Sequence, residues 1–252
     1  MLSEIHNKEI KIFYEEIDID LPEQILNNIK ENWKKIEQEK SNVWNGKVIC
    51  IAEFIETDEK VEIHCRRSDY AHYLYDERIG LPQEYKCRNL SAGCILKTLD
   101  NYLIVGELDS STSYPTMMQI PGGNIDKSDI NGNVVDIIKT INRETLEEVN
   151  IDLENKELVS DYKVCYIYEP ETKKETQGMQ ILAVANLNMT KAEMENYYKE
   201  YYKYLSDNNL EKEFKTIHFI SSIEQLEKMS NPKRQYLLPL VKSVIEDGCK
   251  KI

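Results

Sequence analysis

The chain of 252 residues lacks the features that define several large classes of protein. Residues 1–5 (MLSEI) contain no basic region followed by an apolar core, so no secretory signal peptide is expected. No apolar run approaches the roughly 20 residues that a membrane-spanning helix needs. There is also no internal repeat and no low-complexity linker. We therefore expect a cytoplasmic, globular protein without a membrane partner.

The chain also lacks an excess of positive charge and lacks paired cysteine motifs. Its 45 acidic residues outnumber 32 lysines and arginines, and the formal net charge is -13. This charge does not favour nucleic acid as a partner, and an anionic substrate would need local help from a metal ion and arginines. None of the six cysteines forms a C-x-x-C pair, and most lie in apolar stretches such as residues 48–51. Buried reduced thiols are expected rather than a disulfide framework.

The pattern of apolar residues predicts an α+β protein. A composition of 41% hydrophobic residues allows a sizeable core, in one large domain or two modest ones. Helix-capping signals lie at Asp20-x-x-Glu23 and Thr190-x-x-Glu193. We predict strands over 10–15, 46–57, 61–66, 90–99, 102–108, 117–120, 163–168, 179–187 and 214–220, and further helices over 222–229 and 233–246. Residues 87–252 would form the main domain, and residues 1–86 a smaller α+β extension.

The most informative stretch of the chain is Arg143-Glu144-Thr145-Leu146-Glu147-Glu148. It places one guanidinium and three carboxylates within six residues of a predicted helix, where positions three and four apart are neighbours. Glu144 then faces Glu147 and Glu148. Because clustered carboxylates repel one another, stability alone does not explain this arrangement. A divalent cation would reverse the repulsion, and Mg²⁺ is usually held by a few carboxylates together with substrate phosphates.

A pair of glycines precedes this helix. Pro121-Gly122-Gly123 follows the apolar run Met117–Ile120, which we predict to be a strand. Glycines at the end of a strand allow the backbone to approach a ligand or an ion closely. The predicted order is thus a strand, a Gly-Gly turn, a loop and an acidic helix.

This order and these residues resemble the Nudix box, whose pattern is G-x5-E-x7-R-E-U-x-E-E-x-G-U, with U apolar. The resemblance runs from Gly123 to Ile151 and is carried by Gly123 and the four charged residues Arg143, Glu144, Glu147 and Glu148. The fold that it implies is a mixed sheet sandwiched between helices. The activity that it implies is hydrolysis of a diphosphate linkage with Mg²⁺, or Mn²⁺ as an alternative.

The chain departs from the pattern in its first half. The position six residues after Gly123 is Asp129 instead of Glu, and 13 residues separate Asp129 from Arg143 where the pattern has 7. We interpret the excess as an insertion around residues 130–133. Either Asp129 or Asp136 could replace the missing Glu. Asn150 stands where Gly is usual, a mild change because Asn tolerates the left-handed conformation that ends helices.

The resemblance implies a role for each residue of the box. Glu144 and Glu148 would be metal ligands, and Glu147 would bind a metal directly or through water. The Gly123 carbonyl would complete the coordination shell. Arg143 would hold the carboxylates in place through a salt bridge. Some members of the family draw their general base from a loop outside the box, and Glu169, Glu171 and Glu175 of the loop at 169–177 are candidates here. For each single residue, an ordinary solvated loop is the favoured interpretation.

The layout of the whole chain resembles the UDP-glucose pyrophosphatase branch of the Nudix family, which implies a nucleotide sugar cleaved to UMP and a hexose 1-phosphate. The features include Trp33, Trp44-Asn45-Gly46 and the stretch from Arg66 to Tyr70. Arg66, Arg67 and Tyr70 could contact phosphate or base, or could simply flank a strand end. ADP-ribose or another nucleotide remains an alternative substrate, as do a non-catalytic nucleotide-sugar sensor and an interaction module. The N-terminal extension could mediate a homodimer.

Overall fold

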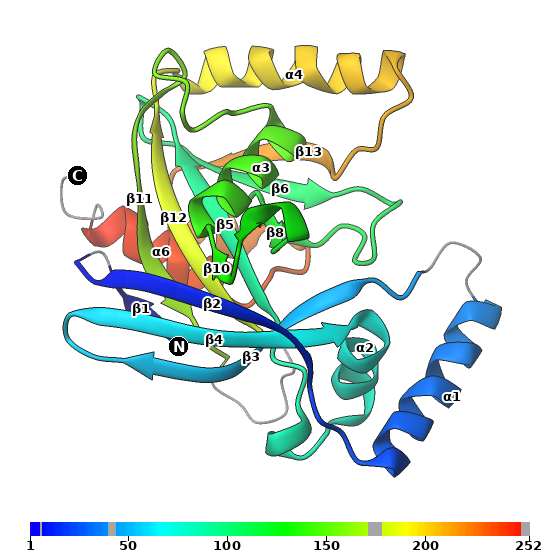
Figure 1. Cartoon of the computed structure of the whole chain (residues 1–252). Coiled ribbons are helices and arrows are strands. Elements are labelled where there is room, and N and C mark those ends of the chain that lie inside the picture. Colours follow the sequence, from blue (N-terminus) through cyan, green and yellow to red (C-terminus); the bar gives the residue numbers. More distant parts are fainter. Residues whose placement is uncertain (6, 40–43, 171–177, 248–252) are drawn as a thin grey trace.

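The computed structural model describes residues 1–5, 7–39, 44–170 and 178–247, and it confirms the α+β class (Figure 1). Within these residues, no helix is long and apolar enough to cross a membrane. One sheet has the strand order β1-β11-β12-β5-β6-β13. These strands are β1 (Leu2–Glu4), β11 (Val159–Tyr168), β12 (Met179–Leu187), β5 (Leu90–Lys97), β6 (Leu103–Leu108) and β13 (Phe214–Ile220). Two short strands join the same sheet: β7 (Met118–Gln119) pairs with β6, and β8 (Gly122–Asn124) pairs with β5.

A second sheet has the order β3-β4-β2-β10-β9. Its strands are β3 (Lys47–Glu56), β4 (Lys60–Asp69), β2 (Glu9–Asp18), β10 (Val134–Val135) and β9 (Ile130–Asn131). The α-helices are α1 (Glu23–Glu39), α2 (Tyr70–Ile79), α3 (Ile137–Val149), α4 (Lys191–Asp207), α5 (Ile223–Lys228) and α6 (Leu237–Asp247). Two short 3-10 turns, η1 (Gln83–Tyr85) and η2 (Lys127–Asp129), precede β5 and β9.

Both faces of the first sheet are covered. Because side chains alternate along a strand, Cys94 and Leu96 of β5 face a core shared with α3, α4 and the second sheet, whereas Ile95 faces α5 and α6 on the other side. Figure 1 shows α6 behind the sheet and α3 in front of it. The mixed sheet is therefore sandwiched between helices, as the sequence predicted.

The hairpin predicted at 90–108 forms, but its two strands diverge. β5 and β6 pair only at Lys97 and Leu103. Beyond that point, β8 pairs with β5 and β7 pairs with β6. The segment from β7 to β8 thus fills the gap between the two strands and brings Gly122 and Gly123 into the middle of the sheet.

Local signals explain where α3 begins and ends. The Asp136 side chain accepts a hydrogen bond from the Lys139 backbone N–H at 3.1 Å and caps the first turn. At the other end Asn150 adopts the left-handed conformation (φ 59°, ψ 30°), so Asn serves as the C-terminal cap that Gly usually provides.

The N-terminal segment is joined to the rest of the chain by strand pairing. β1 pairs with β11, and the residues interpreted as an insertion form a β9–β10 hairpin whose β10 pairs with β2. Ile5 and Ile12 share a core with residues of β5 and β12. The division into segments 1–86 and 87–252 stays a prediction.

One helix was not predicted, and two local predictions were wrong. Residues 70–79 form α2, which has no clear helical period in the sequence and which Asp69 caps. Gly122 and Gly123 lie in strand β8 and not in a turn, because they pair with Gly93 and Ala92 of β5. The closing helix starts at Leu237, since residues 232–234 first pair with Met118. Of the five cysteines in the described ranges, Cys50, Cys65, Cys87 and Cys94 are free and buried, as expected, but Cys165 is disulfide-bonded.

The left-handed cap gives a test of the α3 boundary. We expect Asn150→Ala to destabilise the protein by about 1 kcal/mol more than Asn150→Gly, because Ala is strained at positive φ and Gly is not. Urea unfolding of both variants measures this difference. Asn208, which ends α4 at φ -101°, is the matched control: Asn208→Ala and Asn208→Gly should not show the same preference for Gly. Equal losses for both Asn150 variants would contradict the prediction.

Candidate active site

Two buried carboxylates of α3 lie against the glycine pair of β8. A Cβ atom on Gly123 would stand 2.5 Å from Oε1 of Glu144, so only glycine allows this close approach of the carboxylate to the backbone. Glu148 accepts a hydrogen bond from the Gly122 backbone N–H at 3.0 Å. Glu144 and Glu148 are 9% and 7% exposed. The structure thus brings Gly122–Gly123, Glu144 and Glu148 together.

The guanidinium of Arg143 connects the residues around this pair. Its Nη1 donates to Oε1 of Glu144 at 2.7 Å and to Oε2 of Glu147 at 3.3 Å. Its Nη2 donates to Oδ2 of Asp129 at 2.9 Å and to the Asn124 carbonyl at 3.0 Å. One planar cation therefore joins α3, η2 and β8, and it restricts the rotamers of the carboxylates that it contacts.

The structure separates the two candidates for the missing first Glu. Asp129 has a fully buried side chain and pairs with Arg143. Burial opposes its ionisation, but hydrogen bonds from Arg143 and the Asp126 backbone hold its pKa below the usual value. Asp136 caps α3 and makes no such pair in the described contacts. Asp129 therefore occupies the position beside the arginine, and the 13-residue spacing is absorbed by the β9–β10 hairpin.

Glu147 differs from its two neighbours. Its side chain is 60% exposed and its described ion pair is with Arg143. The sequence placed all three carboxylates on one face, whereas the structure buries Glu144 and Glu148 and leaves Glu147 at the solvent edge of that face.

Negative charge is under-compensated at Glu144 and Glu148. Burial raises the pKa of Glu144 to about 7, against the lowering effect of Arg143. Burial also raises the pKa of Glu148 well above its usual value, with further contributions from Glu213 and Glu144. Glu213 lies just before β13, far from α3 in the sequence. Its side chain is exposed to solvent on one side, but the surrounding protein atoms partly desolvate the carboxylate and raise its pKa.

The donor set is suitable for a hard divalent cation. Within the described ranges, no three His, Cys, Asp or Glu side chains converge in a metal-binding arrangement. Two carboxylates, Glu144 and Glu148, do converge on the backbone of Gly122–Gly123, and their raised pKa values mean that a positive charge there would be stabilising. Mg²⁺ fits such a partial set, because it commonly keeps several waters and takes only one or two carboxylates together with substrate phosphates.

A cleft of about 710 Å³ is lined by Gly122, by Gly123 and by residues of both sheets. The starts of β3 and β5 form parts of its walls. Hydrogen-bonding side chains that line it include Asn89, Ser91, Ser111, Thr112, Ser113, Gln119, Asn124 and Gln180. Aromatic side chains that line it are Trp44, Tyr70, Tyr73, Tyr114 and Tyr236. A volume in this range suits a substrate of nucleotide size.

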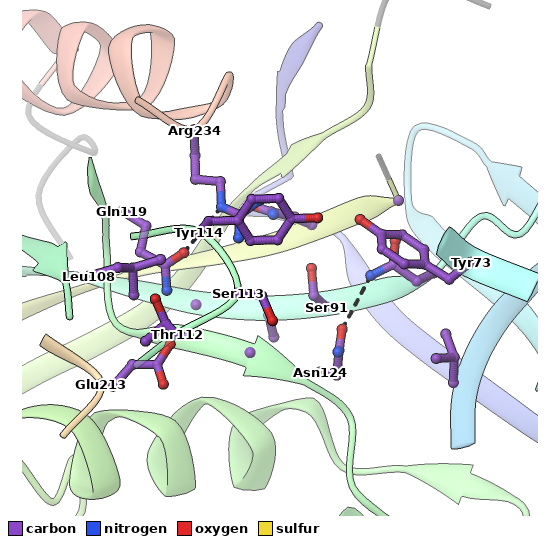
Figure 2. A pocket seen from close by; sticks show the side chains of 18 of the residues that line it. Tyr73, Ser91, Leu108, Thr112, Ser113, Tyr114, Gln119, Asn124, Glu213 and Arg234 are labelled. Atoms are coloured by element: carbon purple, nitrogen blue, oxygen red, sulfur yellow. Dashed lines mark hydrogen bonds between the residues drawn. The ribbon is translucent and has the colours of Figure 1, made fainter. Parts of the chain in front are cut away.

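Arg234 is a cationic side chain of the cleft wall. It lies over the ring of Tyr114, with 4.5 Å between the guanidinium carbon and the ring centroid, and donates to Gln119 at 3.2 Å. The Tyr114 hydroxyl in turn donates to the carboxylate of Glu77. Figure 2 shows Arg234, Gln119 and Tyr114 together on one side of the cleft, with Glu213 on the side nearer the acidic helix.

Of the predicted substrate-binding residues, only Tyr70 lines the cleft. The prediction for Arg66 and Arg67 is not supported: their strand, β4, pairs with β2, whose acidic side chains hold them. Arg67 forms ion pairs with Asp18 and Glu16, and Arg66 lies 3.9 Å from a Glu15 oxygen.

The candidates for a general base have a different outcome. Glu169 forms an ion pair with Arg88 at 2.6 Å and does not line the cleft. Glu171 and Glu175 lie outside the described residues. Sequence reasoning missed Glu213 and Arg234, which stand in no motif and reach the cleft only through the pairing of β13 with β6 and of residues 232–234 with β7.

Comparison with known proteins gives weak similarities. No protein-family model matches the chain, and no curated protein matches it. A MutT protein from Methanosarcina mazei Go1 is 14% identical, with 64% of this chain and 95% of that chain covered and a TM-score of 0.38. DR0079 from Deinococcus radiodurans is 9% identical, with 82% and 100% covered and a TM-score of 0.44.

A third solved structure is a bifunctional NMN adenylyltransferase/ADP ribose pyrophosphatase from Francisella tularensis, complexed with AMP and a Mn ion. It is 13% identical, with 70% of this chain and 46% of that chain covered and a TM-score of 0.43. Because all three TM-scores lie below 0.5, no function is transferred from these structures to the chain.

The raised pKa of Glu144 predicts how stability depends on pH. An unfolded Glu titrates near 4.5, and the folded group titrates at about 7. The folded metal-free protein therefore binds more protons between these values, and its stability falls as pH rises from about 4.5 to 7, by up to about 3 kcal/mol. Urea unfolding in EDTA at pH 5 and pH 8 measures the fall.

Two further measurements complete this test. Glu144→Gln, which cannot ionise, should lose less stability over the same range. Mg²⁺ should raise the melting temperature more at pH 8 than at pH 5, because protons compete with the ion at low pH. A larger effect of Mg²⁺ at pH 5 would contradict the assignment.

Proposed function

We propose that the protein is a Mg²⁺-dependent pyrophosphohydrolase of the Nudix type that cleaves a nucleoside diphosphate linked to another moiety. The observation that carries the proposal is the convergence of Glu144 and Glu148 on Gly122–Gly123, the glycine pair that lines the cleft. Two buried carboxylates with raised pKa values are unfavourable for stability, and a function that requires a cation there explains their presence.

Within this proposal, Glu144, Glu148 and the Gly123 carbonyl would hold Mg²⁺ or Mn²⁺, and Glu147 would contribute through water. When bound, the ion would neutralise the diphosphate and activate a water molecule. Arg143 acts as a positioning residue, since its four contacts hold the carboxylates before substrate arrives. Asp129 in turn orients Arg143 from a fully buried position.

Glu213 is the residue that we assign to proton transfer. Its carboxylate is near enough to Glu144 and Glu148 to raise their pKa values, and it lines the cleft. Its own pKa is raised, which suits a general base that operates near neutral pH. This assignment replaces the loop candidates, of which Glu169 is engaged by Arg88.

The lining of the cleft favours a nucleotide sugar as substrate, with UDP-glucose cleaved to UMP and glucose 1-phosphate as the specific candidate. Hydroxyl and amide side chains can bind the hydroxyl groups of a sugar and a ribose, and Trp44 and Tyr70 offer faces on which a base can stack. Arg234 can bind a phosphate group, because its planar guanidinium matches phosphate oxygens.

The catalytic prediction concerns Glu148. Incubation with a panel of UDP-sugars, ADP-ribose and dinucleotides in Mg²⁺ should release nucleoside monophosphate from at least one compound. Glu148→Gln should lower kcat by about 100-fold or more, since it removes a charged ligand of the ion. Glu213→Gln should lower kcat by about 100-fold and weaken the rise of rate with pH.

Glu195→Gln is the matched control, because Glu195 is a half-exposed residue of α4 whose described ion pair is with Lys199. It should keep full activity. Wild-type turnover by Glu148→Gln would refute the metal assignment. Binding of a panel compound without any turnover by the wild-type protein would favour a sensor over an enzyme.

The substrate prediction concerns Trp44. This side chain is 78% exposed, and its ring lies over Gly46 at the edge of the cleft, so its removal should not disturb the core. Trp44→Ala should raise KM for the nucleotide about five-fold with little change in kcat, because about 1 kcal/mol of stacking is lost. Trp44→Phe should restore most of the affinity. An unchanged KM in Trp44→Ala would remove Trp44 from the substrate site.

A further inference from the structure

Two buried cysteines face each other behind the wall of the cleft. Cys50 belongs to β3, and Cys87 lies between η1 and β5, 37 positions further along the chain. Their Sγ atoms are 2.7 Å apart. Both residues are fully buried, and both are free thiols. Neither takes part in the proposed hydrolysis, so the mechanism gives no reason for their juxtaposition.

The backbone around both cysteines is fixed. Cys50 forms a bridge with Asn89, and the Ile51 N–H donates to the Arg88 carbonyl at 2.7 Å. The Cys87 N–H donates to a carboxylate oxygen of Asp76, itself buried, at 3.0 Å. The two sulfur atoms are therefore held in contact by hydrogen bonds on both sides, and a bond between them would need little movement of the backbone.

The environment makes the two thiols unequal. Burial opposes ionisation of Cys87, but hydrogen bonding to Cys50 and His72 lowers its pKa below the usual value. Ser68 lies 3.7 Å from the Cys87 sulfur and 2.7 Å from Nδ1 of His72. Burial raises the pKa of Cys50 well above its usual value. Cys87 thus has the character of an attacking thiolate and Cys50 that of a thiol that resolves.

We propose that Cys50 and Cys87 are a site of reversible disulfide formation that fastens the two sheets to each other. With hydrogen peroxide as oxidant, the Cys87 thiolate attacks one peroxide oxygen and the O–O bond breaks. A sulfenic acid and hydroxide result, and the hydroxide takes up the proton that Cys87 released on ionisation, which gives the first water. The Cys50 sulfur then attacks the Cys87 sulfur. The S–S bond forms, and hydroxide leaves with the Cys50 proton as a second water. Two thiols and one hydrogen peroxide give one disulfide and two waters.

The position of the pair gives the bond a structural consequence. Residues 46–48, at the start of β3, line one wall of the cleft, and Asn89 and residues 91–93, at the start of β5, line another. Val48 packs with Cys50 and Cys87 in one small apolar cluster, against which Tyr70 and Tyr73 lie. A covalent bond between positions 50 and 87 would therefore join the two walls and resist their separation.

Peptide mapping of the whole protein tests the site directly. Reduced protein is treated with hydrogen peroxide, alkylated, digested without reductant and analysed by mass spectrometry. We expect one new cross-link between the peptides that contain Cys50 and Cys87, with the loss of two hydrogen atoms and full reversal by dithiothreitol. A cross-link of Cys50 or Cys87 to any other cysteine, or no cross-link while the protein stays folded, would overturn the proposal.

Variants separate this pair from the other buried thiols. Cys65→Ser and Cys94→Ser are the matched controls, since both residues are free and buried, and they should form the cross-link like the wild type. In Cys50→Ala, Cys87 should accumulate as a sulfenic acid that dimedone traps, whereas in Cys87→Ala, Cys50 should stay unmodified. Modification of Cys50 in Cys87→Ala would contradict the assigned roles.

The melting temperature measures whether the Cys50–Cys87 disulfide restrains the two sheets. The oxidised wild type should melt about 5–10 °C above the reduced wild type, because the bond closes a loop across two sheets. Peroxide should raise the melting temperature of Cys50→Ala and Cys87→Ala by a smaller amount, which the disulfide of Cys165 accounts for. A cross-link without any rise in the wild type would show that the bond does not restrain the two sheets.

Discussion

The arrangement of the candidate site depends on a single guanidinium. Arg143 contacts Asp129, Glu144, Glu147 and the Asn124 carbonyl, so one side chain ties the helix α3 to the 3-10 turn before it and to the strand β8 beside it. A lysine could not replace it, because an ammonium lacks the planar set of donors that reaches several acceptors at once. In the described part of the chain, Glu148 has no such cationic partner and accepts one hydrogen bond, from the Gly122 N–H. The two buried carboxylates, Glu144 and Glu148, are therefore only partly balanced by positive charge.

These carboxylates can lie directly against the backbone of β8 only because the residues there are glycines. At Gly123 the space that a side chain would fill is taken by the Glu144 carboxylate. The glycines hold this position because β5 and β6 part after Lys97 and Leu103, and β8 enters between them. Strand geometry, glycine and carboxylates thus form one connected arrangement.

Those parts of the structure with a local cause could be predicted from the sequence. The cap at Thr190 and Glu193, the left-handed Asn150 and the hairpin of β3 and β4 each follow from residues a few positions apart. The carboxylates of α3 could be placed because helix geometry sets which side chains are neighbours. The fold class followed from the same periodicities.

Features that depend on contacts distant in sequence could not be found in this way. Helix α2 buries Ala71, His72, Leu74 and Asp76 and so has no apolar period to reveal it. Glu213 and Arg234 reach the cleft only because β13 and residues 232–234 pair with strands more than 100 positions earlier. Arg66 and Arg67 looked available for phosphate, yet β2 lies beside them and supplies Glu15, Glu16 and Asp18.

The short β9–β10 hairpin has a consequence for how the chain can be divided. It follows directly on Asp129, the partner of Arg143, and its second strand, β10, is held by β2 of the N-terminal segment. A shortened chain that began at residue 87 would expose the backbone of β10 and leave the anchor of Arg143 on an unsupported loop. The N-terminal segment thus supports the position of Asp129, and its removal would weaken the contacts through which Arg143 holds the carboxylates of α3.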